Sequence, residues 1–148
     1  MQVIGSQFSR PGAEGDFGWM IERPEYADAL FVFNDNEGEF RAHQRHAAGA
    51  RQCHAGGGNA VIRPYQCENP PRAAGIPTGD RGGYPRLTGD ARAAIDDALA
   101  AITALVASGR YQRVIYSAAD DTGTLGTGIF DVADDVKRYI VNGLQALR

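Results

Sequence analysis

The stretch DALFVFNDNEGE, residues 28–39, decides the fold class of this chain. Residues 29–33 are apolar without interruption, so both faces of a strand formed there would be apolar. Such a run is typical of a strand in the middle of a sheet. A second stretch of this kind, RVIYSA at 113–118, predicts another buried strand.

Helical periodicity alternates with these strands. Between Asp90 and Ser108, apolar residues recur at positions 95, 99, 102 and 106, which form one stripe of a helix, and Gly109 follows where a left-handed C-terminal cap belongs. A final helix carries its stripe at positions 132, 136, 139/140 and 144. The alternation predicts an α/β layered fold with some parallel pairing. No repeat or linker divides the chain, which predicts a single domain over residues 1–148.

The remaining segments carry weaker signals. Residues 5–18 resemble a surface loop after a short first strand, and residues 39–54 a loop or short irregular helix. The segment 59–63 predicts the first turn of a helix that is cut short near Pro64, and residues 72–79 predict a brief strand ended by Pro77.

Composition restricts the functional classes. The 148 residues are 43% hydrophobic and 22% charged, as in soluble globular proteins, and no apolar run reaches the roughly 18 residues that span a bilayer. The net charge of −3 argues against general nucleic-acid binding. Two cysteines and no signal peptide predict a reducing, cytoplasmic location.

Glycine is concentrated in loops. The segment HAGGGN contains Gly56, Gly57 and Gly58, and DTGTLGTG contains Gly123, Gly126 and Gly128. Each loop is predicted to follow a buried strand and precede a helix, where free amides and the helix dipole can hold phosphate. Two such loops at one sheet edge suit a diphosphate. The alternative is that the glycines only make tight turns. Neither loop has the Lys-Ser/Thr of a Walker loop or the G-x-G-x-x-G spacing.

Taken together, LFVFNDN, HAGGGNAVI, VIYSA and GTLGTGIF resemble the macrodomain family, and in particular small macrodomain-like proteins of phages and bacteria. The resemblance extends over about Ala29 to Leu144. It implies a three-layer α/β/α sandwich around a mixed sheet, with ADP-ribose held between the two glycine loops.

The resemblance also implies roles for individual residues. Asn36 corresponds to the asparagine at the distal ribose, Phe130 to the aromatic residue that packs on it, and Asp16, within GDF, to the aspartate that holds adenine. Asn59 stands where the family has a small apolar residue. The predicted ligand-binding set is Asp16, Asn34, Asn36, Gly56, Gly57, Gly58, Asn59, Gly123, Gly126, Thr127, Gly128, Ile129 and Phe130.

Several of these residues have structural alternatives. Asn34 and Asn36 could close the strand with side-chain turns, and Phe130 could be a core residue that opens the last helix. Asp120 and Asp121 could be solvated loop charges.

All histidines and cysteines gather between residues 43 and 67, which leaves a tetrahedral zinc site as another possibility. Its candidate ligands are His43, His46, Cys53, His54 and Cys67. The alternative is solvent-facing histidines with semi-buried cysteines.

Three functional classes follow. The first, which the sequence favours, is a module that binds or sequesters an ADP-ribose-type nucleotide, as a phage protein would to blunt host defence. The second is a hydrolase that removes ADP-ribose, with Asn36 and Asp35 as catalytic candidates, or Asp120 or Asp121 as the base. The third is a zinc-supported structural domain. The expected partner is a small-molecule nucleotide, with no cofactor, nucleic acid or membrane, and the sequence assigns no oligomeric state.

Overall fold

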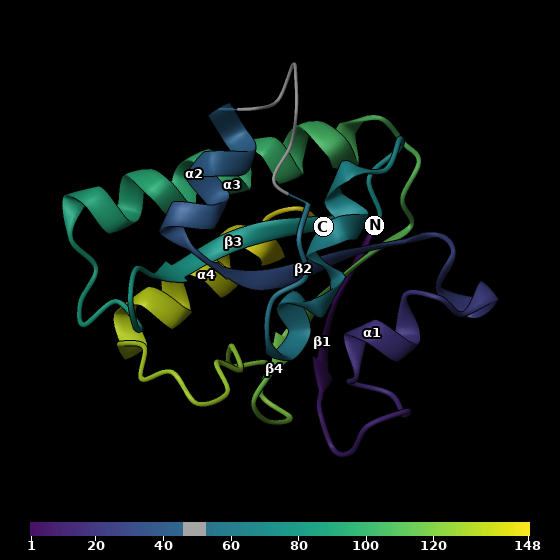
Figure 1. Ribbon diagram of the computed structural model, residues 1–148, viewed down its shortest axis with the longest axis horizontal. Helices are drawn as coiled ribbons and strands as arrows, with labels where there is room; N and C mark the ends of the chain where they lie inside the picture. Colours follow the sequence, from purple (N-terminus) through teal and green to yellow (C-terminus); the bar gives the residue numbers. More distant parts are fainter. Residues whose placement is uncertain (46–52) are drawn as a thin grey trace.

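Four strands form one sheet in the computed structural model, which describes residues 1–45 and 53–148. The strands are β1 (Gln2–Gln7), β2 (Ala29–Asn36), β3 (Ala73–Gly79) and β4 (Arg113–Ala118). They lie in the order β1-β4-β2-β3, and every neighbouring pair is parallel (Figure 1). The two strands predicted as central are therefore β2 and β4, which confirms that prediction.

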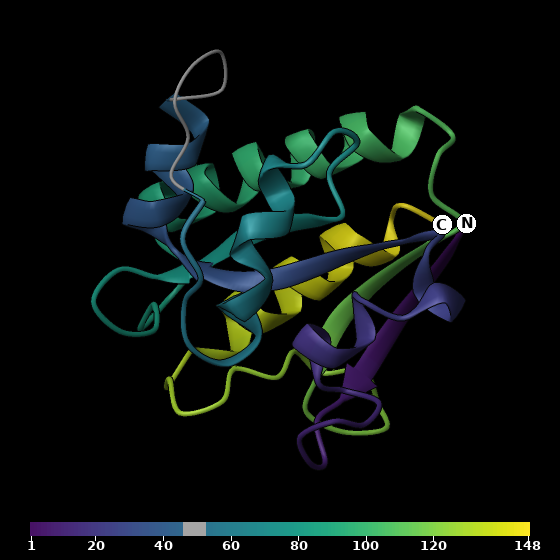
Figure 2. The ribbon, with the colours of Figure 1, turned by 45° about the vertical axis from the view of Figure 1, so that its right-hand side comes forward.

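The sheet is apolar on both faces, because consecutive residues of β2 are apolar and their side chains point to opposite faces. Leu30 and Val32 pack into one cluster, and Phe31 and Phe33 pack into another. The first cluster takes in α3 (Gly89–Ala107) and α4 (Asp134–Gln145), and the second takes in α1 (Phe17–Met20) and the 3-10 helix η2 (Gly58–Cys67). Helices thus cover both faces, as Figures 1 and 2 show.

The two predicted helices are present with the expected faces. Thr88 caps α3 by accepting a hydrogen bond from the Ala91 amide, and Gly109 has a φ of +77° just beyond the end of that helix. The fully buried side chains of α4 recur with helical spacing at Val136, Ile140 and Leu144.

Several boundaries differ from the sequence prediction. A regular helix, α2 (Glu37–Arg45), follows β2 directly, and a short 3-10 helix, η1 (Pro24–Tyr26), precedes it. Pro64 lies inside η2 instead of ending it, and β3 continues beyond Pro77 to Gly79. An edge strand accommodates proline because one of its sides has no strand to bond.

The mixed sheet is not confirmed. Strand pairs within the described residues are parallel, and the antiparallel contacts among them are two isolated bridges, Gly79 with Gly83 and Ala118 with Leu125. Because the strands run in one direction, their carboxyl ends share one edge of the sheet. Gln7, Asn36, Gly79 and Ala118 end the strands at this edge.

Within the same described residues, no helix is both long and apolar enough to cross a membrane.

Candidate functional site

A hydrogen bond joins the end of β2 to the second glycine loop. Asn34 donates from Nδ2 to the carbonyl oxygen of Gly126 over 2.7 Å. Since Asn34 follows Phe33 on β2, its side chain leaves the sheet on the face that α3 and α4 cover. The structure therefore brings together two residues that the sequence places 92 positions apart.

The second loop doubles back on β4. The Ala119 amide donates to the Thr124 carbonyl, Leu125 bridges Ala118, and the Gly126 amide donates to the Ser117 carbonyl. The amide of Gly126 is thus already bonded to the protein. A ligand would meet the turn that follows, residues 127–130, rather than Gly126 itself.

This turn exposes apolar side chains. The Phe130 amide donates to the Thr127 carbonyl, the Thr127 hydroxyl donates to the Phe130 carbonyl, and Gly128 has a φ of +61°. Ile129 is 95% exposed and Phe130 is 54% exposed. Because α4 begins only at Asp134, Phe130 is not a core residue that opens the last helix, and the turn is separated from the dipole of α4.

The first loop has a different setting from the one expected. It follows α2 and residues 46–52, which lie outside the described part of the chain, so it does not come directly after a strand. Gly58 begins η2 with a φ of +56°. A Cβ atom at Gly57 or at Gly58 would meet no atom within 4 Å, so their backbone faces open space.

Gly56 is a glycine for another reason. A Cβ atom there would lie 2.8 Å from Nη1 and 3.0 Å from Nη2 of Arg63. The group that approaches this backbone so closely is a guanidinium of the protein itself. Sequence reasoning missed Arg63, and its one signal was a charged residue within the segment NAVIRPY, residues 59–65.

Arg63 forms a buried ion pair with Asp35. Arg63 Nη2 lies 2.6 Å from Asp35 Oδ1, and the exposed fractions of the two side chains are 8% and 1%. The Asn36 amide also donates to Asp35 Oδ1, over 2.9 Å. Burial raises the pKa of the Asp35 carboxyl above its usual value, against the lowering effect of Arg63. Asp35 is therefore enclosed within the protein, away from any substrate water.

The other predicted polar residues have structural partners. Asp16 caps α1, with Oδ1 accepting from the Trp19 amide, and its Oδ2 accepts from the Gly12 amide at 2.7 Å. Asn59 Oδ1 accepts from the Phe17 amide at 3.3 Å, which brings the first loop next to the Asp16 segment. Asn36 is exposed, and its Oδ1 accepts from the Glu39 amide in the first turn of α2.

Asp120, Asp121 and Gly123 lie beside β1. Asp120 Oδ1 accepts from the amide and hydroxyl of Thr122, which lowers the pKa of this exposed carboxyl, and Asp121 accepts from the Gln7 side chain. These three residues help line a polar hollow of about 370 Å³. A second hollow of about 420 Å³ separates the segment 122–125 from α4. Neither hollow is lined by residues 34–36, 56–59 or 126–130.

Acidic residues surround the exposed end of β2. Glu37 and Glu39 are the first and third residues after Asn36, and a Cβ atom at Gly38 would lie 3.9 Å from Asp80 Oδ1. These carboxylates would repel the negative charge of a phosphate, so a phosphate is disfavoured next to Asn36. An anion at this edge is better placed against the amides of the two loops.

The structure corrects the expectation that the two cysteines are free thiols. Cys53 and Cys67 form a disulfide that encloses the first glycine loop and η2. Disulfides are typical of oxidising compartments, so the cysteines no longer argue for a reducing one.

Paired cysteines cannot serve as thiolate ligands, which removes two members of the postulated zinc set. Within the described residues no group of three or more His, Cys, Asp or Glu could hold a metal ion. His43 lies in the last turn of α2, the His54 carbonyl accepts from Arg63, and His46 is outside the described residues.

Comparison of the chain with family models, curated proteins and solved structures gave no match.

Proposed function

We propose that the chain binds ADP-ribose, or a nucleotide derived from it, at the carboxyl edge of its sheet, as a macrodomain would. The hydrogen bond from Asn34 to Gly126 carries this proposal, because it fixes the second glycine loop to the end of the central strand β2. The ion pair from Asp35 to Arg63 ties η2, which the first loop opens, to the same strand end. Ligands of parallel α/β sheets gather at this edge.

The two loops offer different contacts. Gly57 and Gly58 present an open backbone at the start of η2, which suits a phosphate. Ile129 and Phe130 offer exposed apolar surface, and an aromatic ring can cover a ribose or a base. The diphosphate is therefore assigned to the first loop and to residues 127–129, with Phe130 over the distal ribose.

Binding without rapid turnover agrees best with the positions of the carboxylates. A general base must come within hydrogen-bond reach of the attacking water. Asp35 is buried against Arg63, and Asp120 and Asp121 line the hollow beside β1. We therefore assign the protein to the nucleotide-binding or sequestering class rather than to the hydrolases.

Calorimetry with ADP-ribose, its cyclic derivatives and AMP tests the proposal. Gly57→Glu should abolish binding by bulk and charge without affecting the fold, because residue 57 faces open space. Gln112→Glu is the matched control, since it adds the same charge just before β4, at the opposite edge of the sheet. If the unmodified protein shows no heat of binding with any ADP-ribose derivative, the proposal is refuted.

Turnover is tested separately. The protein is incubated with ADP-ribosylated substrates and heated, and the released compounds are analysed. Intact nucleotide in a one-to-one amount agrees with sequestration. Many equivalents of free ADP-ribose, lost in Asn36→Ala, would place the chain among the hydrolases.

A further inference from the structure

Arg63 connects three separate parts of the chain. It lies in η2, its Nη2 pairs with Asp35 at the end of β2, and its Nη1 donates to the His54 carbonyl over 3.1 Å. His54 directly precedes the first glycine loop. One buried guanidinium thus attaches the start of that loop to the central strand.

Glycines make room for this ion pair on both sides. A Cβ atom at Gly56 would lie 2.8 Å from Nη1 of Arg63, and one at Gly75, on β3, would lie 3.0 Å from Oδ2 of Asp35. Contacts below 3.0 Å require the guanidinium or the loop to move. The backbone of the loop is therefore shaped around the side chain of Arg63.

A buried ion pair is an inefficient source of stability, because the desolvation of both charges offsets their attraction. Its best-attested use is to fix one arrangement among several. In this chain, the ion pair would fix the conformation of the segment that presents Gly57 and Gly58 to solvent.

We propose that Arg63 is a positioning residue, which holds residues 54–60 in the conformation that receives the phosphates without touching the ligand itself. This inference rests on the proposed function for the identity of the ligand. The positioning itself can be measured in the free protein, because it depends only on contacts within the chain.

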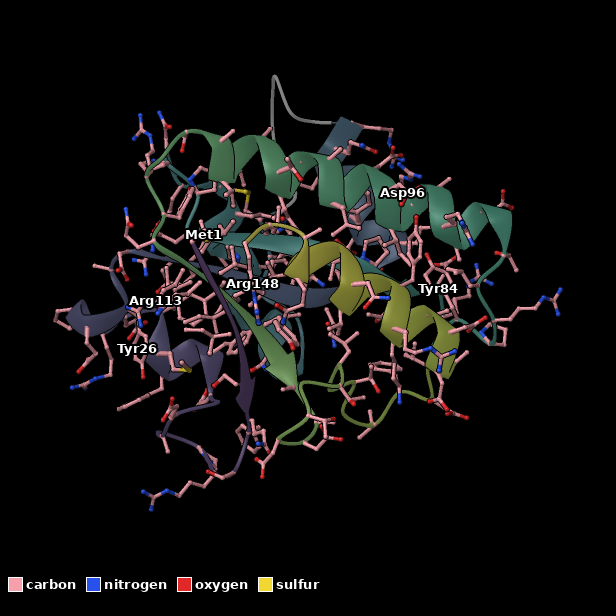
Figure 3. All side chains as sticks on the ribbon, turned by 180° about the vertical axis from the view of Figure 1, so that it is seen from behind. Met1, Tyr26, Tyr84, Asp96, Arg113 and Arg148 are labelled. Carbon is pink, nitrogen blue, oxygen red and sulfur yellow. A yellow bond between two sulfur atoms is a disulfide. The ribbon has the colours of Figure 1, made fainter. Side chains whose placement is uncertain are left out.

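The test compares Arg63→Met with Arg113→Met. Arg113 makes equivalent contacts at the other end of the sheet, where its Nη2 lies 2.5 Å from Asp28 Oδ1 and 2.6 Å from the Glu25 carbonyl. Figure 3 shows Arg113 beside Tyr26, across the molecule from Tyr84, which follows β3. Both variants remove one charged partner and one bond to a carbonyl, but the exposed fraction of the side chain is 21% for Arg113 and 8% for Arg63. The comparison therefore uses the local exchange ratio and not the global stability.

Hydrogen exchange of the backbone amides is the first readout. In Arg63→Met, the exchange of the Gly56 and Ala60 amides, which donate to carbonyls within this segment, should rise by about tenfold or more relative to the exchange of α3, because the contact with His54 no longer resists local opening. Arg113→Met should leave this ratio unchanged. An unchanged ratio in Arg63→Met, with only a uniform loss of protection, would overturn the proposal.

Gly56→Ala is the second variant, for use if Arg63→Met does not fold. Its Cβ atom displaces the guanidinium while the charge stays in place, and it should reproduce the local increase in exchange. Gly57→Ala, with open space around its Cβ, is its control for the exchange measurement.

Calorimetry with ADP-ribose separates the two proposals. If the unmodified protein binds, Arg63→Met should weaken the affinity about tenfold or more, and Arg113→Met should not change it. Equal affinity in Arg63→Met would overturn the positioning role. If the unmodified protein does not bind, the proposed function fails, and the exchange ratio alone decides whether Arg63 positions the loop.

Discussion

Asn34 Nδ2 lies 2.7 Å from the carbonyl oxygen of Gly126 and attaches the second loop to the central strand β2. Asn34→Asp has nearly the same shape but replaces the donor with a carboxylate, which would face that carbonyl oxygen. We expect a loss of about 1–3 kcal/mol in the free energy of unfolding, since a partly buried acceptor loses its partner. Urea unfolding of the two proteins measures it.

Asn36→Asp is the matched control. The contact of Asn36 uses its Oδ1 as an acceptor for the Glu39 amide, and aspartate has the same acceptor. Measured in about 1 M salt, which screens the added charge from the neighbouring acidic residues, the free energy of unfolding should change by no more than about 0.5 kcal/mol. Equal losses in the two variants would show that the bond from Asn34 to Gly126 contributes nothing specific.

Two glycines near α3 should respond in opposite ways to alanine. A Cβ atom at Gly83 would lie 2.2 Å from the carbonyl oxygen of Asp131, whereas one at Gly89 would meet no atom within 4 Å. Gly83→Ala should therefore destabilise the fold by about 1–3 kcal/mol. Gly89→Ala should stabilise it by about 0.4–1 kcal/mol, because it restricts only the unfolded chain. Thermal unfolding distinguishes the two, and a gain in Gly83→Ala would contradict the described packing of residues 83 and 131.

Asp35 should make stability depend on pH. Because burial raises its folded pKa above the ordinary value of 3.8, the folded chain binds this proton more tightly than the unfolded chain. Its contribution to stability is fully present below the unfolded pKa and is lost as the pH rises through the folded pKa. The unfolding free energy of the unmodified protein minus that of Asp35→Asn should therefore decrease as the pH is raised above about 4. Urea unfolding across this range measures the difference. An increase with pH would mean that Arg63 holds the pKa below its ordinary value.

Reduction of the disulfide should destabilise the protein. The bond from Cys53 to Cys67 closes a ring with a sequence separation of 14 residues. A ring of this size restricts the unfolded chain by about 3 kcal/mol, so a reducing agent should lower the free energy of unfolding by about that amount. The double variant with serine at both positions should unfold at the same urea concentration with and without the reducing agent. A response of that variant to the reducing agent would contradict this explanation.

The elements that the sequence predicted correctly are those with a strong local pattern. The apolar runs at 29–33 and 113–118 identified the central strands, and the stripe of Ile95 and Ile102 identified α3, because burial imposes these periods directly. The predicted boundaries were wrong in η2 and β3, where proline was taken as a terminator. Pro64 and Pro77 lie within a 3-10 helix and an edge strand, and both accommodate a missing N–H group.

The site depended on contacts between distant residues, and these leave little local signal. Nothing near Gly56 shows that Arg63 packs against it, because the guanidinium is directed there by Asp35, 28 residues earlier. The disulfide was missed because two cysteines in a chain of this length were taken as reduced, and their pairing depends on how η2 folds back. The role of Asn34 could be suggested from its place at a strand end, but its partner Gly126 could not.

The strand order has a consequence for how the chain acquires its structure. Every neighbouring pair in the order β1-β4-β2-β3 joins one strand from residues 2–36 to one from residues 73–118. Among the described residues, neither half of the chain contains two adjacent strands, so a nascent chain that ends before β3 lacks the partners of β1 and β2 in the sheet. β1 stays without a neighbour until β4 has been synthesised. Such distant pairings slow folding, since the entropy of closing long loops is lost before the contacts form. A chain cut between β2 and β3 should recover its structure only when both fragments are mixed, which makes this protein a natural candidate for a split reporter.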